Sequence, residues 1–238
     1  MTGVGGLTTR LFADGADLEE ILALARDERI SGFTTNPTLM RKAGVADYAA
    51  FAAELLEHVR TKPVSFEVFA DEPDEIRRQA KLISSWADNV YVKVPVTTTR
   101  GERLDELVRE LSEGGVRVNV TAIFTLDQVR RITAAVRDGA PSYVSIFAGR
   151  IADAGVDPVP LVAEALEIMR EAPRAECIWA SPRELYNLVQ ANAVGCHIIT
   201  MTNDLLRKLD CLGKPLEQFS LETVEMFHRD AAAAGYSL

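Results

Sequence analysis

The sequence is short of the residues that build metal centres and disulfide frameworks. Its 238 residues include three cysteines and three histidines. The histidines are scattered, without the spacing to Cys, Asp or Glu that a metal site needs, so we expect no metal. The cysteines are odd in number and far apart, and Cys177 and Cys196 each lie in an apolar stretch. We therefore predict buried free thiols at these two positions.

Long apolar runs and excess positive charge are also missing. No segment approaches the roughly 18 apolar residues that a membrane-spanning helix needs. The net charge of −9 argues against nucleic-acid or anionic-membrane partners, which require a clustered positive field. Residues 1–8 are Gly-rich without a signal-peptide layout, and we expect a disordered leader there. Together these features predict a cytoplasmic protein that binds neither nucleic acid nor a membrane.

What the sequence does contain is a regular alternation of strand-like and helix-like segments. Strands are expected at residues 10–14, 32–36, 64–69, 89–96, 117–124, 143–149, 176–181 and 196–201. Amphipathic helical patterns lie between them, and a last one is expected within residues 215–238. This alternation implies parallel strands with right-handed crossovers, and eight units predict one α/β domain, a (β/α)8 TIM barrel spanning residues 1–238. A doubly wound sheet is the alternative, but no Gly-x-Gly-x-x-Gly follows the first strand.

The fourth predicted strand carries a lysine among valines. Lysine is almost never fully buried unless it is paired or functional. Because alternate side chains of a strand face the same side, Lys93 should face the barrel interior with Tyr91 and Pro95, while the valines face the helices. By the same rule Asn119 and Thr121 both point inward.

Other predicted strands also end in polar residues, and barrel active sites lie at the C-terminal ends of the strands. The set is Asp14, Thr34, Thr35, Asn36, Glu67, Asn119, Thr121, Ser145, Arg150, Ser181 and Arg183, so every predicted strand except the last contributes. Each residue has an ordinary explanation when taken alone. Asp14 could cap a helix, and Glu67, which should share its face with Phe69, could form a structural ion pair with Lys93. A core has no reason to collect all of them at one rim.

Carbonyl chemistry uses such a set. A lysine kept from water loses its proton more readily, because desolvation disfavours the ammonium, and the neutral amine can form a Schiff base with a ketone. The iminium withdraws electrons, so the adjacent C–C bond can break or form. A carboxylate takes the hydroxyl proton, and a second group positions water. Two arginines suit a phosphate.

Six motifs carry a resemblance that runs from the first strand to the C-terminal helix. They are FADGAD (12–17), GFTTNPTLM (32–40), VYVKVPVT (90–97), VNVTAIFT (118–125), IFAGRIAD (146–153) and ASPRELYNL (180–188). By these motifs the sequence resembles the transaldolases, in their small, fructose-6-phosphate-aldolase-like branch. TTNP and VKVP, in this order on a barrel-length chain, are highly specific together.

The resemblance implies a cofactor-free enzyme of carbohydrate metabolism, as in the pentose phosphate pathway, that moves a dihydroxyacetone unit between sugar phosphates. The implied catalytic residues are Lys93 as the Schiff-base lysine, Asp14 as the acid/base where the C–C bond breaks, and Glu67 and Thr121 as holders of the catalytic water. The implied substrate-binding residues are Asn36 and Asn119 for the dihydroxyacetone portion and Arg150, Ser181 and Arg183 for the acceptor phosphate, and Thr35, Ser145 and Phe147 complete the set.

Two positions separate the branches of the resembled family. Its fructose-6-phosphate aldolases carry glutamine at the position of Glu67 and tyrosine at that of Phe147, and its true transaldolases carry glutamate and phenylalanine. The resemblance therefore favours transfer of the dihydroxyacetone unit. The alternatives are an aldolase that releases free dihydroxyacetone, a specialised transaldolase for an unusual sugar, and a catalytically inactive barrel. Pro182 departs from the aromatic residue common there. The resemblance also implies a homo-oligomer, a pentamer or decamer, in which residues 215–238 pack on a neighbouring subunit.

Overall fold

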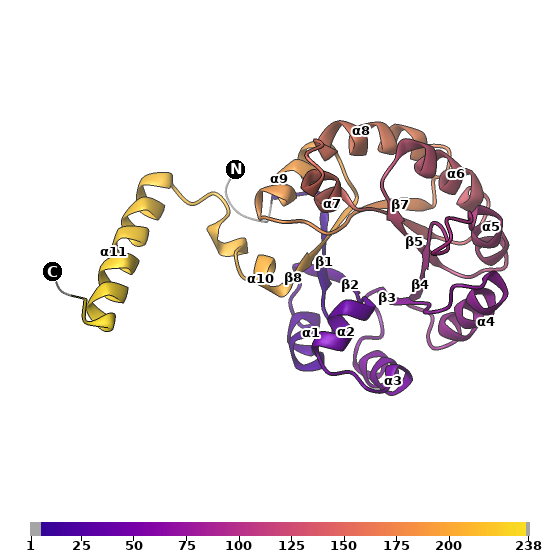
Figure 1. The fold of residues 1–238 in the computed structure, drawn as a ribbon, viewed down its shortest axis with the longest axis horizontal. Helices are drawn as coiled ribbons and strands as arrows, with labels where there is room; N and C mark the ends of the chain where they lie inside the picture. The colour runs from indigo at the N-terminus through magenta and orange to yellow at the C-terminus, as the bar shows by residue number, and fades with distance from the viewer. Residues whose placement is uncertain (1–5, 237–238) are drawn as a thin grey trace.

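Eight parallel strands form a closed barrel, in which each strand pairs with its neighbours in the sequence and β8 pairs with β1 (Figure 1). The computed structural model describes residues 6–236. The strands are β1 (Arg10–Asp14), β2 (Ile30–Thr34), β3 (Val64–Glu67), β4 (Val90–Pro95), β5 (Val118–Ile123), β6 (Ser142–Ile146), β7 (Ala175–Trp179) and β8 (Ile198–Thr202). The predicted (β/α)8 barrel of α/β class is thus confirmed.

Helices surround the barrel and follow the strands along the chain. They are α1 (Leu18–Ala25), α2 (Pro37–Lys42), α3 (Tyr48–His58), α4 (Pro73–Ser84), α5 (Asp105–Glu113), α6 (Leu126–Val136), α7 (Ala148–Asp153), α8 (Pro158–Met169), α9 (Tyr186–Ala193), α10 (Asn203–Leu206) and α11 (Leu216–Ala234), with a 3-10 turn at Leu209–Cys211. Several helices begin at residues that favour a helix N-terminus. Thr125 and Gln128 form a capping box at α6, and prolines begin α4 and α8.

The alternation of side chains along β4 is as predicted. Val90, Val92 and Val94 belong to the large core between the barrel and its helices, whereas Tyr91 belongs to a second cluster inside the barrel. Phe69 differs from the prediction that it shares a face with Glu67. Because β3 ends at Glu67, Phe69 lies beyond the pleat and is exposed on the outside of the barrel.

The C-terminal helix α11 extends away from the barrel, as Figure 1 shows. None of its 19 residues is buried, and its exposed apolar side chains include Phe219, Val224 and Phe227. The predicted C-terminal helix is therefore present, although residues 237–238 lie outside the described part of the chain. An apolar face of this extent on a protruding helix is typical of an interaction surface.

The predicted disordered leader falls partly on residues 1–5, which the structure does not describe. Its last two residues are held in place. Leu7 packs against the core, and the Thr8 amide donates a hydrogen bond of 2.8 Å to Asn192 Oδ1. An ordered attachment to α9 thus begins before β1.

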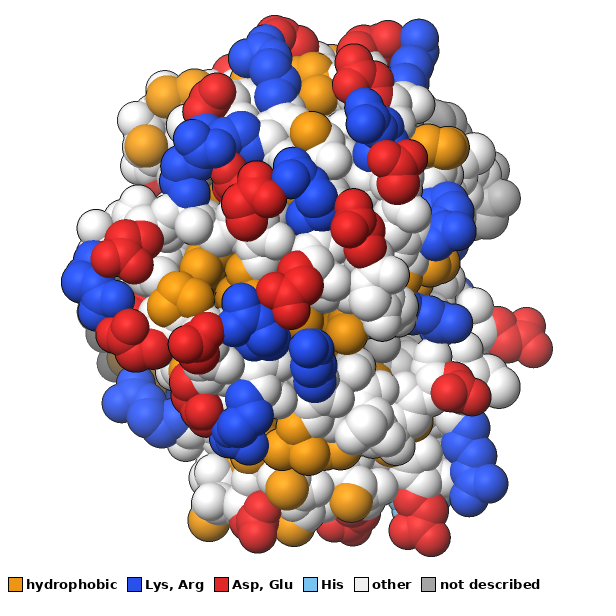
Figure 2. All heavy atoms as spheres, turned by 90° about the vertical axis from the view of Figure 1, so that its right-hand side faces the viewer, with side chains coloured by type: hydrophobic (Ala, Val, Ile, Leu, Met, Phe, Trp, Pro, Cys, Tyr) orange, Lys and Arg blue, Asp and Glu red, His pale blue; other side chains and the backbone are white. Residues whose placement is uncertain are grey.

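The surface carries charges of both signs. Figure 2 shows acidic and basic side chains interspersed over one face, with no area of a single sign dominating it. Within residues 6–236, no helix has both the length and the apolar composition to cross a membrane. The three cysteines are free thiols, and Cys177 and Cys196 are buried, as predicted.

Candidate active site

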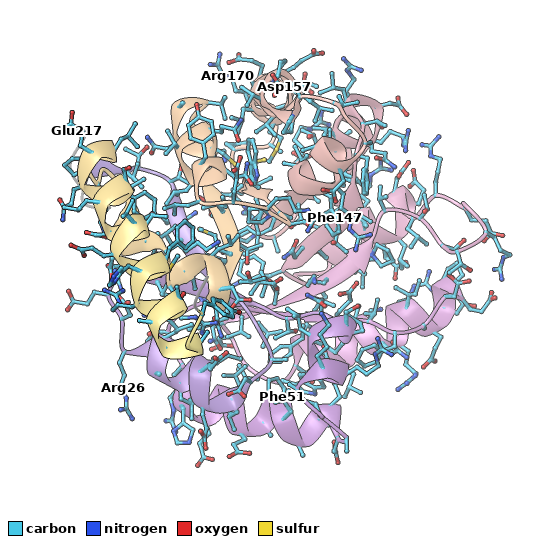
Figure 3. All side chains as sticks on the ribbon, turned by 60° about the vertical axis from the view of Figure 1, so that its left-hand side comes forward. Arg26, Phe51, Phe147, Asp157, Arg170 and Glu217 are labelled. Carbon is cyan, nitrogen blue, oxygen red and sulfur yellow. The ribbon has the colours of Figure 1, made fainter. Side chains whose placement is uncertain are left out.

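A cavity of about 520 Å³ opens at the C-terminal ends of the strands and gathers nearly all of the predicted site residues. Its lining includes Asp14, Asn36, Glu67, Lys93, Asn119, Thr121, Ser145, Phe147, Arg150, Ser181 and Arg183. Figure 3 places Phe147 towards the middle of the molecule, away from the peripheral Arg170 and Glu217. Of the twelve predicted residues, the cavity lining lacks Thr35 alone.

Lys93 lies at the bottom of this cavity, only 7% exposed. Its Nζ donates to the backbone carbonyl of Thr35 at 2.6 Å and lies 3.0 Å from Glu67 Oε2. Glu67 and Lys93 are register partners on β3 and β4, which explains why the two side chains meet. The lysine is thus enclosed, and a carboxylate able to accept its proton is in direct contact.

Asp14 ends β1 beside this pair. Thr34 donates to its Oδ1 at 2.8 Å, and Asn36 Nδ2 lies 3.4 Å from its Oδ2. Burial raises the pKa of Asp14, while the charge of Lys93 and these two hydrogen bonds act in the opposite direction. A carboxyl whose pKa is raised towards neutrality suits a group that must both take and return a proton.

Three polar side chains form a chain of hydrogen bonds on the barrel floor. Ser145 Oγ donates to Asn119 Oδ1 at 2.6 Å, and Asn119 Nδ2 donates to Ser65 Oγ at 3.0 Å. These contacts fix the orientation of the Asn119 amide, and all three residues are buried. A fully connected set of this kind presents donors and acceptors of defined orientation to a bound ligand.

Backbone strain occurs next to one site residue, Thr121, and at another, Ser181. Ala122, directly after Thr121, has φ of +60°, and the pairing of β5 with β6 is irregular at this point. Ser181 also has φ of +60°, and no other non-glycine residue in the described chain has a positive φ. Strained conformations of this kind persist where the surrounding structure enforces them, often at functional sites.

The β6–β7 side of the mouth carries two arginines. The Arg150 guanidinium lies 5.6 Å from the centre of the Phe147 ring. Arg183 Nε contacts both carboxylate oxygens of Asp153, at 3.0 and 3.1 Å, which lowers the pKa of Asp153. Arg183 Nη2 also donates to Asp153 Oδ2, so this bidentate pair leaves Nη1 as the terminal nitrogen without a contact to Asp153.

Glycine at position 149 allows the loop after β7 to approach the start of α7 closely. A Cβ atom there would lie 1.6 Å from the carbonyl oxygen of Ser181. The amides of Arg183 and Glu184 donate to Asn187 Oδ1, which holds the end of the same loop. The loop with Pro182 is therefore packed in place, with Pro182 buried at the cavity wall.

The structure differs from the sequence-based expectations at Thr35 and at the last strand. The Thr35 side chain is fully buried, donates to the Ser65 carbonyl at 2.9 Å and does not line the cavity. Its backbone carbonyl accepts from Lys93 Nζ. The last strand does contribute, because Thr200 and Thr202 of β8 line the cavity.

Some residues of the site were not singled out from the sequence. Thr200 Oγ lies 2.6 Å from Thr34 Oγ and so belongs to the network around Asp14. Lys42 of α2 lines the cavity as well. Because alternate side chains of a strand face the same side, the position of Thr200 in β8 could have indicated that it points into the barrel. Its contact with Thr34 is visible only when the pairing of the strands is known. Asn36 also caps α2 through the Leu39 amide, so it has a structural role as well as a place in the site.

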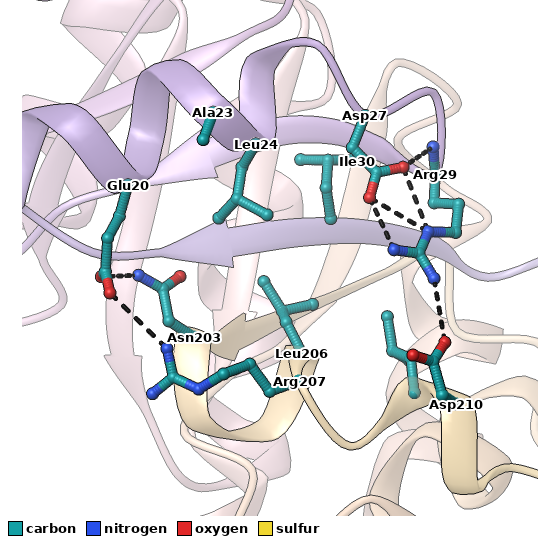
Figure 4. Close-up of a pocket in the computed structure, with 11 residues that line it drawn as sticks. Glu20, Ala23, Leu24, Asp27, Arg29, Ile30, Asn203, Leu206, Arg207 and Asp210 are labelled. Carbon is teal, nitrogen blue, oxygen red and sulfur yellow. Dashed lines mark hydrogen bonds and ion pairs between the residues drawn. The ribbon is translucent and has the colours of Figure 1, made fainter.

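A second cavity, of about 360 Å³, lies outside the barrel between α1 and the segment after β8 (Figure 4). Its floor is apolar, with Leu24, Ile30 and Leu206, and the charged groups of its rim pair with one another, as in the contact of Arg29 with Asp27. Its lining contains no lysine. The reactive groups are therefore concentrated at the barrel mouth.

The chain is similar to known proteins over most of its length. Residues 11–238 match the family described as Transaldolase/Fructose-6-phosphate aldolase. A protein of Dehalococcoides mccartyi named probable transaldolase is 36% identical over 84% of this chain and 89% of its own length. A probable transaldolase of Herpetosiphon aurantiacus is 34% identical over 90% of this chain and 92% of its own, and a probable transaldolase 2 of Listeria monocytogenes is 34% identical over 84% and 88%.

Proposed function

Because this chain belongs to the transaldolase/fructose-6-phosphate aldolase family, we propose that it is a transaldolase that transfers a dihydroxyacetone unit through a Schiff base on Lys93. The donor would be a ketose phosphate such as fructose 6-phosphate or sedoheptulose 7-phosphate, and the acceptor an aldose phosphate. The observation that carries the proposal is the enclosed contact of Lys93 Nζ with Glu67, at 3.0 Å, in one cavity with Asp14.

The first step uses Lys93 and Glu67. Glu67 accepts a proton from the Lys93 ammonium, directly or through a water held with Thr121, and the free amine adds to C2 of the ketose. The C2 hydroxyl then leaves as water with a proton from the same groups, giving the iminium. Hydrolysis of the final iminium follows the same route in reverse.

Asp14 acts on the carbon–carbon bond. Its carboxylate takes the proton of the C4 hydroxyl while the C3–C4 bond breaks, the aldose phosphate departs and the electron pair remains in the enamine. When the acceptor aldehyde arrives, the enamine carbon attacks it and Asp14 returns the proton to the new alkoxide. Asn36, which lies between Asp14 and α2, and the floor residues Asn119 and Ser145 are suited to hold the hydroxyls of the three-carbon unit.

Phe147 favours transfer over release. It lines the cavity and its side chain has no proton to donate, so the enamine is not protonated from this position and persists until an aldehyde binds. An aldolase that releases free dihydroxyacetone needs a donor there. Arg150, Ser181 and Arg183 at the β6–β7 side supply the cationic and hydroxyl groups that a phosphate would bind.

The same proposal extends to the assembly and the location of the enzyme. The exposed apolar face of α11 supports a homo-oligomer in which this helix packs on a neighbouring copy. Phosphorylated sugars and free thiols are both consistent with a cytoplasmic enzyme.

Borohydride reduction in the presence of fructose 6-phosphate, followed by peptide mass mapping, tests the proposal. We expect a reduced adduct on Lys93. An adduct on Lys42, which lines the same cavity, or no adduct with any ketose phosphate would overturn it. Addition of erythrose 4-phosphate then separates the alternatives, because sedoheptulose 7-phosphate indicates transfer and free dihydroxyacetone indicates release. A panel of other aldehydes identifies a specialised acceptor.

A further inference from the structure

The barrel has a gap in its hydrogen bonding between β2 and β3, directly beside the catalytic pair. The two strands pair through only two register positions, Phe33 with Val64 and Thr34 with Ser65. After Thr35, whose amide still donates to the Ser65 carbonyl at 3.1 Å, the chain leaves the sheet to begin α2. Glu67, two residues along β3, therefore has no strand partner on this side.

In a regular parallel ladder the Thr35 carbonyl would accept a hydrogen bond from β3 at this point. When an amide in one strand donates to a carbonyl in the neighbouring parallel strand, the carbonyl of the donating residue normally accepts from the amide two residues beyond that acceptor. The partner of the Thr35 carbonyl would thus be the Glu67 amide. In the structure this carbonyl instead accepts from Lys93 Nζ at 2.6 Å.

The hydroxyl of Tyr48 fills the vacated position. It accepts from the Glu67 amide at 2.8 Å and lies 3.2 Å from the Glu67 carbonyl, to which it donates. Tyr48 comes from α3 and is held by edge-to-face contacts with Phe66 and Phe69. Burial raises the pKa of its hydroxyl, which keeps the proton needed for this double contact.

We propose that Tyr48 is a positioning residue for the Lys93–Glu67 pair. Its hydroxyl takes the place of the missing strand at Glu67 and so leaves the Thr35 carbonyl free to hold the lysine. One side chain outside the cavity thereby fixes the backbone under the carboxylate and preserves an acceptor for the ammonium. The inference rests on the proposed function, since it assigns Tyr48 to the steps that form and hydrolyse the Schiff base.

Tyr48→Phe is the direct test, because it removes both hydrogen bonds and keeps the aromatic packing. Without the hydroxyl, the Glu67 amide turns to the Thr35 carbonyl and competes with Lys93 for it. We expect the rate of adduct formation with fructose 6-phosphate, per active site, to fall by about 10- to 100-fold, the range found for small misplacements of catalytic groups. Exchange of erythrose 4-phosphate on the preformed enamine, which depends on Asp14, should keep its rate.

Active sites are counted by the final amount of borohydride-trapped Lys93, so partial unfolding does not enter the rates. Tyr186→Phe is the matched control, since Tyr186 is 59% exposed and lies outside the cavity. Wild-type rates of adduct formation in Tyr48→Phe, or an equal loss in the exchange step, would overturn the positioning role. Absence of a Lys93 adduct in the wild-type protein would instead overturn the proposed function.

Discussion

Replacing Thr34 with valine should shift the pH dependence of carbon–carbon bond cleavage. The substitution keeps the shape of the side chain but removes the hydroxyl that donates to Asp14 Oδ1 at 2.8 Å. Thr34 has one hydroxyl proton, and the carboxylate uses it. The 2.6 Å contact between Thr34 and Thr200 must then be a donation from Thr200.

The size of the shift follows from the type of bond. A hydrogen bond to a charged group contributes about 1.5–3 kcal/mol. One pKa unit corresponds to roughly 1.4 kcal/mol, so loss of the Thr34 donor is worth about 1–2 units. The donor stabilises the ionised carboxylate, and its removal therefore raises the pKa of Asp14 further in the direction in which burial already moves it.

The assay is the pH profile of carbon–carbon bond cleavage, followed as release of the aldose phosphate from fructose 6-phosphate in a single turnover, because this step needs the ionised Asp14 carboxylate. In Thr34→Val the acidic limb should move up by about 1–2 pH units. Thr200→Val should give a smaller shift of the same sign, because it only weakens the donor. Thr133→Val is the control, since this buried hydroxyl on α6 has no hydrogen-bond partner in the described structure. An acidic limb that does not move in Thr34→Val would show that this hydroxyl does not stabilise the Asp14 carboxylate.

Substitutions at three further positions test the site. Gly149→Ala places a Cβ against the Ser181 carbonyl, so KM for erythrose 4-phosphate should rise about tenfold. Trapping of Lys93 with unphosphorylated dihydroxyacetone should be unchanged. An equal loss in both measurements would argue against a phosphate site. Ala122→Val should lower the free energy of unfolding by about 1–3 kcal/mol in urea titrations, and Ala122→Gly should not, because only glycine relaxes at φ of +60°. Asp14→Asn should abolish cleavage yet raise Tm at pH 7. The raised pKa of Asp14 means that its ionised form opposes folding, so this gain disappears as the pH falls below the ordinary value of 3.8, and a gain that persists there would contradict the assignment.

Features that lie within regular strands were predictable from the sequence. The alternation along β4 and β5 correctly placed Lys93, Asn119 and Thr121 inside the barrel. The same rule was wrong at Phe69, which lies just beyond the end of β3. Side chains alternate between the two faces only within a pleated strand, so the rule does not apply where the chain turns towards a helix.

Partners from distant parts of the chain could not be predicted in the same way. The contacts of Thr200 with Thr34 and of Asp153 with Arg183 depend on how the strands close into a ring and how α7 is oriented. Tyr48 is an amphipathic-helix residue by its sequence pattern, and nothing local indicates that its hydroxyl meets Glu67. Such contacts become visible only when the gap between β2 and β3 is known.

The protruding helix α11 has a consequence for how the protein unfolds. A helix that buries none of its residues gains no hydrophobic stabilisation from its own barrel, while ordering each residue costs about 1–2 kcal/mol of entropy. In the proposed oligomer that cost is met by contacts with another copy, so the stability of α11 depends on protein concentration and that of the barrel much less. Dilution should therefore unfold α11 before the barrel, and thermal unfolding should show two cooperative transitions rather than one.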